Sequence, residues 1–254
     1  MPLKTTALEP IIDDLTMIVE IFEKQSSEMG FENIIPAKFH EVSTNAYQLG
    51  IAHLLHTGDT EQFRENLIRS AKYRVNLLEQ ASKQPQLYDD YSYSYHLNPF
   101  FAAIISNDFP LARRIAELSE FPENPGYEYH DEFIYAKILY RFILNDCSPG
   151  VDSDALMQEY LEDCSGEEDA RYRLLKSLSE KDEIQFKKSI RELLDSKAEY
   201  YEEIGNGLIN DLVDFSTEQF VCLEGTALVV LARKLGLKTE RFYRGIPMAA
   251  LELS

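Results

Sequence analysis

The chain has 254 residues, of which 44% are hydrophobic, so it is long enough to bury a sizeable core without disulfides or structural metals. Its formal net charge of −19 argues against nucleic acid as a ligand and against docking on anionic lipid, because both need clustered Lys and Arg. The same charge permits a basic protein partner, although solubility alone would also account for it.

The cysteines and the apolar runs indicate in which cellular compartment the protein is expected. Cys147, Cys164 and Cys222 are widely spaced and form no C-x-x-C pair, so the sequence indicates neither a zinc site nor a disulfide framework. The N-terminal residues lack the apolar core of a signal peptide, and the longest apolar run, about residues 227–232, is too short to span a bilayer. We therefore expect a cytoplasmic protein with reduced thiols.

Apolar residues at helical spacing predict a helical N-terminal region. The first helix covers about residues 8–29, and the second begins at Pro36 and ends at Gly58. The run Asp59-Thr60-Glu61-Gln62 is typical of a capping box and starts a third helix. Because so few residues separate the second helix from the third, the two must form a tight antiparallel hairpin.

The same arrangement occurs three times along the chain. Asp59, Asp108 and Asp182 each follow one helical pattern and precede another, with apolar residues four and eight positions after the Asp. Asp is a favoured N-cap, and positions four and eight later share one helix face. The units resemble tetratricopeptide-type hairpins with irregular spacing, so we expect an all-α fold of stacked antiparallel helical hairpins. No linker interrupts residues 1–254, which favours a single domain, with the turn at residues 148–150 as the candidate minor boundary.

The rest of the chain follows the same periodicity. Two stretches are irregular: residues 84–96, which are rich in tyrosine, and residues 121–130, which hold two prolines and a glycine. A loop and one helical turn are expected over residues 242–251. Further helices are predicted at about residues 131–144, 153–162, 167–178, 182–204 and 217–235.

A search for catalytic or metal-binding motifs yields only weak candidates. His53 and His56 do not match the H-E-x-x-H spacing of a zinc site, and a hydrogen-bonded boundary histidine is the more common role. The run Asp152-Ser153-Asp154 lacks the remaining ligands of a calcium loop, so helix capping explains it better. The chain also lacks a G-x-S-x-G nucleophile motif and a phosphate-binding glycine loop. We therefore predict a protein that is not an enzyme and uses no cofactor or metal.

Two surface features remain as candidate partner-binding sites. One is the tyrosine-rich stretch, because tyrosine buries a large area at low entropy cost. The other is an acidic segment, with no Lys or Arg from Phe142 to Ala170, whose carboxylates could engage a basic partner. The alternative for the tyrosine-rich stretch is a loop folded over the core, and the alternative for the acidic segment is a solvated face. The candidate residues are Tyr88, Tyr91, Tyr93 and Tyr95, and Asp146, Asp152, Asp154, Glu159, Glu162, Asp163, Glu167, Glu168 and Asp169.

Several runs of sequence resemble a known family. They are Phe109-Pro110-Leu111-Ala112-Arg113-Arg114-Ile115-Ala116, Pro125-Gly126-Tyr127-Glu128-Tyr129 with Asp131-Glu132-Phe133 and Tyr135-Ala136, Phe220-Val221-Cys222-Leu223-Glu224-Gly225-Thr226-Ala227-Leu228, Leu231-Ala232-Arg233-Lys234-Leu235-Gly236-Leu237, and Ile246-Pro247. Over about residues 40–250 the chain thus resembles the immunity protein 49 family of bacterial polymorphic toxin systems. The resemblance implies a cytoplasmic antidote that binds and blocks one cognate toxin domain, without a cofactor and without catalytic residues.

The expected function is therefore an immunity protein whose toxin partner has a basic surface, as a nuclease has. A tetratricopeptide-like adaptor that binds peptides in a concave groove is the alternative. A helical enzyme is a third hypothesis, and it would need Glu224 to join His40, His53 or His56 around a metal. Glu224 stands on an apolar helix, and if buried it requires a partner.

Overall fold

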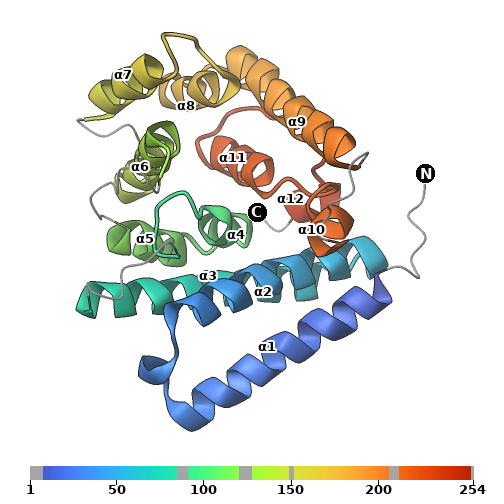
Figure 1. Ribbon diagram of the computed structural model, residues 1–254. Helices are drawn as coiled ribbons and strands as arrows, with labels where there is room; N and C mark the ends of the chain where they lie inside the picture. The colour runs from blue at the N-terminus through green and yellow to red at the C-terminus, as the bar shows by residue number, and fades with distance from the viewer. Residues whose placement is uncertain (1–7, 85–90, 120–127, 149–151, 206–211, 253–254) are drawn as a thin grey trace.

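A computed structural model of the protein describes residues 8–84, 91–119, 128–148, 152–205 and 212–252. Within these ranges the chain forms a single body without β-strands, which confirms the expected all-α class (Figure 1). The helices are α1 (Glu9–Met29), α2 (Pro36–Thr57), α3 (Thr60–Lys83), α4 (Asn98–Ile105), α5 (Phe109–Leu118), α6 (His130–Leu144), α7 (Ser153–Asp163), α8 (Ala170–Glu180), α9 (Glu183–Gly205), α10 (Leu212–Thr217), α11 (Leu223–Lys234) and α12 (Met248–Leu251), with a short 3-10 turn at Phe31–Asn33.

The three predicted capping aspartates start helices as expected. The carboxylate of Asp59 accepts a hydrogen bond from the backbone N–H of Gln62 at 2.9 Å, and that of Asp108 accepts one from Leu111 at 3.0 Å. Asp182 caps α9 in the same way. Each cap satisfies a backbone donor that the first turn of a helix leaves without an intrahelical acceptor. The helices before and after each cap therefore reverse direction and pack as antiparallel neighbours, α2 with α3, α4 with α5 and α8 with α9.

Helix α11 occupies the centre of the molecule. In Figure 1 the chain runs from α4 through α9 around it, while α2 and α3 form the layer below. Its closest helical neighbour is α4, and every residue from Leu223 to Ala232 is buried except Glu224. A helix that is apolar on all sides must be enclosed by others. The inner side of the surrounding helices is thus filled by the chain itself.

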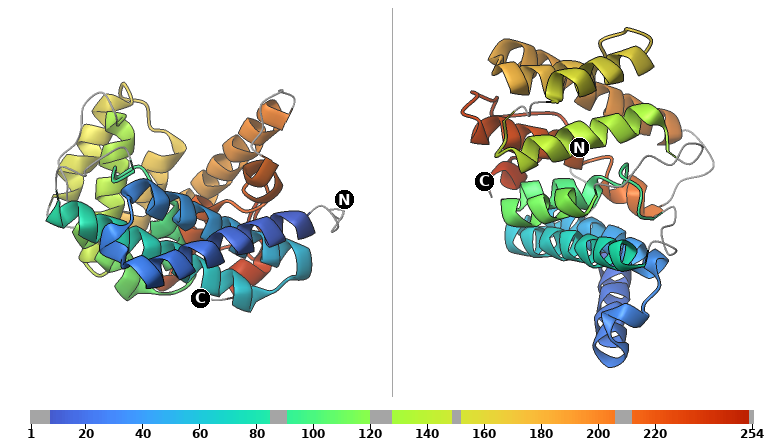
Figure 2. Two further views of the ribbon diagram at one scale, coloured as in Figure 1. Left: turned by 60° about the horizontal axis from the view of Figure 1, so that its bottom comes forward. Right: turned by 90° about the vertical axis from the view of Figure 1, so that its left-hand side faces the viewer.

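Helix α1, unlike the central α11, lies on the outer edge of the molecule. It packs along α2 through the buried side chains of Leu15, Val19 and Phe22, and Figure 2 shows it projecting beyond the α2–α3 layer. One side of α1 is therefore buried and the other faces solvent. None of the helices in the described ranges combines the length and the apolar character that a bilayer crossing requires.

The predicted helix over residues 217–235 is wrong in its first part. Helix α10 ends at Thr217, and α11 begins only at Leu223. The reason is Cys222, whose extended backbone donates its N–H to the carbonyl of Gly245 at 2.8 Å and whose sulfur accepts the N–H of Gly225 at 3.3 Å. These contacts make Cys222 the N-cap of α11 and tie it to the C-terminal loop.

Helix α8 also begins later than predicted, at Ala170 instead of residue 167. Asp169 is its N-cap, and Ser165 and Gly166 just before it have φ values of 59° and 79°, which lie outside the helical region. The candidate boundary at residues 148–150 falls largely outside the described residues, as does most of the irregular stretch predicted at residues 121–130.

Candidate functional site

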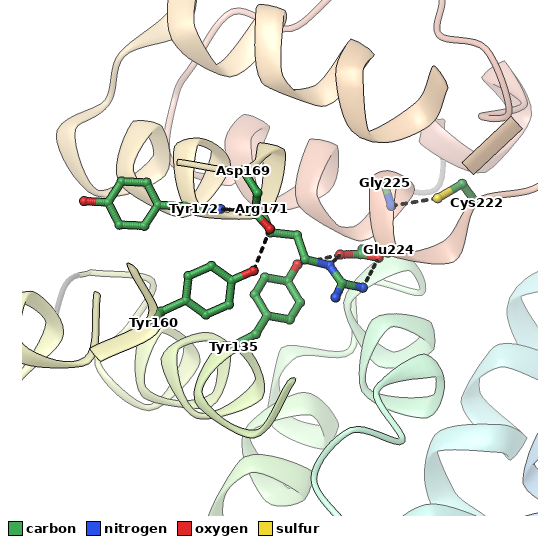
Figure 3. A network of polar contacts seen from close by, with 8 residues as sticks. All are labelled: Tyr135, Tyr160, Asp169, Arg171, Tyr172, Cys222, Glu224 and Gly225. Atoms are coloured by element: carbon green, nitrogen blue, oxygen red, sulfur yellow. Dashed lines mark hydrogen bonds and ion pairs between the residues drawn. The ribbon is translucent and has the colours of Figure 1, made fainter. Parts of the chain in front are cut away.

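Glu224 is held by a polar network in the interior of the fold (Figure 3). The guanidinium of Arg171 donates from Nε to Oε1 of Glu224 at 2.8 Å and from Nη2 to Oε2 at 3.0 Å. The hydroxyl of Tyr135 donates to Oε1 at 2.8 Å. These three hydrogen bonds come from α6 and α8 and meet on α11, so they are the partners that a carboxylate with only 16% of its side chain exposed requires.

A second part of the network lies beside the first. The guanidinium of Arg171 lies 4.6 Å from the centre of the Tyr135 ring, in a cation–π contact. Tyr160 of α7, which is almost completely buried, donates its hydroxyl to Asp169 at 2.8 Å. The same carboxylate caps α8 by accepting the N–H of Tyr172 at 2.7 Å. Asp169, a predicted partner-binding residue, is therefore exposed but already accepts hydrogen bonds from Tyr160 and Tyr172.

The charges of the network shift the protonation equilibria of its members. Burial disfavours the charged form of Arg171, but Glu224 and the neighbouring phenols outweigh this cost and raise the pKa of the guanidinium. Burial and Glu224 raise the pKa of Tyr135. Burial also raises the pKa of the nearby Glu132, although Arg171 opposes this shift. The centre of the network is thus the Arg171–Glu224 ion pair, which Tyr135 contacts from α6, and the pair holds α11 in place.

The histidines of the third hypothesis do not take part in these contacts. His40 lies instead against His96, with ring centroids 4.3 Å apart, and burial, followed by the charge of Arg74, lowers the pKa of His40 to about 4. Among the described residues, no group of three or more His, Cys, Asp or Glu side chains is placed to hold a metal ion.

The tyrosine-rich stretch is folded onto the body of the protein. Tyr93 is buried, Tyr95 is half-buried and Tyr91 is 37% exposed, while Tyr88 lies outside the described residues. Arg74 of α3 is only 1% exposed, and its guanidinium binds the backbone of this stretch. It donates to the carbonyls of Tyr91, Ser92 (3.1 Å) and Tyr93 (2.7 Å).

Two further groups hold the same stretch. Glu128, a buried carboxylate, accepts hydrogen bonds from the N–H of Ser94 at 2.8 Å and from its hydroxyl at 2.6 Å. Tyr140 of α6 donates its hydroxyl to the Ser94 carbonyl at 3.1 Å. Of the predicted tyrosines, the structure therefore leaves Tyr91 the most accessible. Arg74 was missed in the sequence, although its position on the buried stripe of α3 between Ala71 and Leu78 could have revealed it.

The nine predicted acidic residues are all exposed, but they do not form one continuous group. Asp146 lies apart from α7 and pairs with Arg113 of α5 at 2.6 Å. Glu159 lies 3.3 Å from a ring nitrogen of His130, and Glu168 lies 3.9 Å from the ammonium of Lys176. Asp152 stands at the N-cap of α7, but its side chain makes no capping hydrogen bond, so its predicted capping role is wrong.

Five exposed carboxylates at the two ends of α7 remain without a basic partner among the described residues. We call them the α7 carboxylates: Asp152, Asp154, Glu162, Asp163 and Glu167. An exposed carboxylate gains little from a surface ion pair within the fold, and it retains its full charge for an external partner.

Hollows open at several places on the described surface. One of about 650 Å³ lies between α9 and the segment from α10 to α11, and Lys197, Glu218, Cys222 and Arg244 are among its lining residues. Burial raises the pKa of Cys222 to about 11, so its thiol stays protonated near neutral pH. A hollow of about 490 Å³ lies beside Cys147, and one of about 270 Å³ lies beside His40. All three cysteines carry free thiols.

Comparison with known proteins adds no relative: no family model, no curated protein and no solved structure matches the chain.

Proposed function

We propose that this chain is an immunity protein, which binds one cognate antibacterial toxin domain in the cytoplasm and blocks it in a one-to-one complex. The observation that carries this proposal is the set of α7 carboxylates, which are exposed and lack basic partners within the described fold. A toxin with a basic surface, such as a nuclease, supplies the opposite charge. Complementary charge of this kind raises the rate of encounter and disfavours wrong partners.

The family resemblance supports a toxin as the class of partner. Parts of the resembling runs lie on helices that enclose or form the centre of the fold: residues 109–116 on α5, 131–133 and 135–136 on α6, and 223–228 and 231–234 on α11. We infer that these runs define a scaffold, and that the hairpins α2–α3, α4–α5 and α8–α9 form an irregular tetratricopeptide-like stack. The surface carried by this scaffold then determines which toxin is recognised.

The adaptor alternative receives less support from the geometry. A peptide-binding adaptor of this type needs an open groove on its inner side. Here α11 lies on the inner side, and Arg171 and Tyr135 hold it there through Glu224. Recognition through an outer surface is therefore the better supported mode.

Co-expression with the toxin domain encoded beside the gene tests the proposed function. We expect the chain to restore growth of cells that produce the toxin, and the purified pair to have the mass of a one-to-one complex. A chain that neither protects cells nor forms a complex would refute the function.

A charge-reversal pair tests the role of the α7 carboxylates. The variant Asp163→Lys with Glu167→Lys should slow association about tenfold or more at low salt and weaken the dependence of the rate on salt. The matched control is Glu199→Lys with Glu203→Lys on α9, which changes the net charge equally at two other exposed positions. Equal association rates for the two variants would remove the α7 carboxylates from the encounter.

A further inference from the structure

The exposed large apolar side chains of the described residues are most frequent along α1 and the turn that follows it. Five of the eleven large hydrophobic side chains that are exposed lie between residues 17 and 35. By contrast, none lies between Asp146 and Asp182 in the part that the structure describes, where the α7 carboxylates stand. Single exposed apolar residues are normal on a protein surface, but a concentration of them at one edge indicates an interaction site.

Met17 and Ile21 form the centre of this region. They stand one helical turn apart on α1 and are 54% and 49% exposed. The buried side chains of Leu15, Val19 and Phe22 point to the other side of the helix, toward α2. Met17 and Ile21 therefore contribute little to the packing of α1 on α2, and the packing does not explain why they are apolar.

Acidic residues surround the two apolar side chains. Residues 9–35 hold seven acidic residues and one lysine, which gives this edge a net charge of −6. Asp13, Asp14 and Glu20 flank Met17 on α1, and all three are exposed without a basic partner among the described residues. Helical positions three or four residues apart are neighbours on the surface, so Met17 and Ile21 lie in a negatively charged rim.

We propose that this face of α1 is the main contact for the partner, and that the partner is a protein whose basic surface contains an apolar recess for Met17 and Ile21. This assignment rests on the proposed function and names the part of the surface that holds the toxin. Apolar side chains at the centre of an interface supply most of its affinity, while charges at the rim mainly set the rate of encounter. In this division the acidic rim around Met17 and Ile21 sets the rate of encounter at this face, and the two apolar side chains retain the toxin.

A second copy of the chain fits this face poorly. A two-fold contact places the same surface on both sides of the interface, so two edges of charge −6 would face each other. Like charges that meet across an interface strongly oppose association. The negative rim therefore selects a partner of opposite charge.

The decisive variant is Met17→Ser with Ile21→Ser, measured against the purified toxin domain encoded beside the gene. We expect its dissociation constant to rise about 30-fold or more, mainly through faster dissociation, with an unchanged circular dichroism spectrum and Tm. The control is Ile184→Ser on α9. Ile184 lies outside the α1 face and is 84% exposed, so the variant removes an equally apolar side chain from another part of the surface. It should bind like the wild type, and Met17→Leu should retain most of the affinity.

The possible results separate this inference from the proposed function. If the wild type binds and protects while the double variant binds within about threefold of it, the α1 face is not the contact and the immunity function stands. If the wild type neither binds nor protects, both proposals fail. If sedimentation shows that the wild type self-associates and that the double variant does not, the occupant is a second copy and the inference is wrong. Protection of α1 amides from hydrogen exchange in the complex would support it.

Discussion

Arg171 and Glu224 form a bidentate ion pair that joins α8 to α11 across 53 positions of sequence, with N···O distances of 2.8 and 3.0 Å. The side chains are 32% and 16% exposed, so water screens the pair only in part. Tyr135 completes the contacts of the carboxylate from α6. Three helices are thus fixed at one point on the central helix, and the pair should be important for stability.

Replacing Arg171 by Leu should lower the free energy of unfolding by about 2–3 kcal/mol, because Glu224 would remain charged in the interior with one phenol as its partner. Urea denaturation monitored by circular dichroism measures this loss. The double variant Arg171→Leu with Glu224→Leu should recover much of it, since no uncompensated charge remains. Equal losses in the single and the double variant would show that the lost stability comes from packing.

Replacing Arg74 by Met should destabilise the protein by about 3 kcal/mol or more, because three backbone carbonyls lose their donors in a buried place. Arg74→Lys should rescue little, since an ammonium cannot reproduce the planar fork that reaches Tyr91, Ser92 and Tyr93 together. Hydrogen exchange should show faster exchange at residues 91–97 in both variants. Unchanged exchange there would mean that Glu128 and Tyr140 hold the stretch without Arg74.

The stability should fall in acid partly because of His40. Its pKa in the folded protein is about 4, below the ordinary value of 6.5, because burial and then the charge of Arg74 disfavour the protonated ring. The folded state therefore prefers neutral His40. This contribution is complete above about pH 6.5 and is lost as the pH falls toward 4. Between pH 6.5 and pH 4, the free energy of unfolding of His40→Phe should fall by less than that of the wild type. The difference, measured by urea titration, should reach about 3 kcal/mol. A wild-type imidazole that titrates near 6.5 by NMR would contradict the prediction.

Gly50→Ala should separate α2 from α3. A Cβ atom at Gly50 would lie 2.9 Å from the carbonyl oxygen of Phe63 and 3.2 Å from the Cβ of Asn66, so the backbone of α3 would have to move. We expect a loss of about 1–3 kcal/mol in the free energy of unfolding. Gly58→Ala is the comparison, because a Cβ there meets open space and only its φ of 72° opposes the change, at a cost of about 1 kcal/mol. A smaller loss at Gly50 than at Gly58 would show that the two helices can separate easily.

Local chemistry was enough to predict most of the helices. The capping residues Asp59, Asp108 and Asp182 act on backbone groups two or three residues away, so the sequence around them contains the whole interaction. The break before α11 could not be predicted in this way. It depends on Cys222 and Gly245, which are 23 positions apart and meet only in the folded chain.

The candidate site was predictable only in outline. The acidic residues around α7 could be recognised as a group. Which of them pair with Tyr160, His130 or Lys176 and which lack a basic partner depends on contacts that only the fold creates. The tyrosine stretch suggested a binding loop, whereas Arg74 and Glu128 bind its backbone from distant elements. The exposed pair on α1 was visible in the periodicity of the helix, but it gains significance only once α2 is known to cover the other side.

The central position of α11 has a consequence for the order of folding. This helix is synthesised more than a hundred residues after α4, its closest helical neighbour. A chain growing at about 5–20 residues per second thus spends several seconds or more with the apolar inner surface of α4 uncovered. Contacts so distant in sequence also slow the final step of folding. During this interval the nascent chain depends on chaperones or on its strong negative charge to avoid aggregation, and the fold is complete only after α11 has docked.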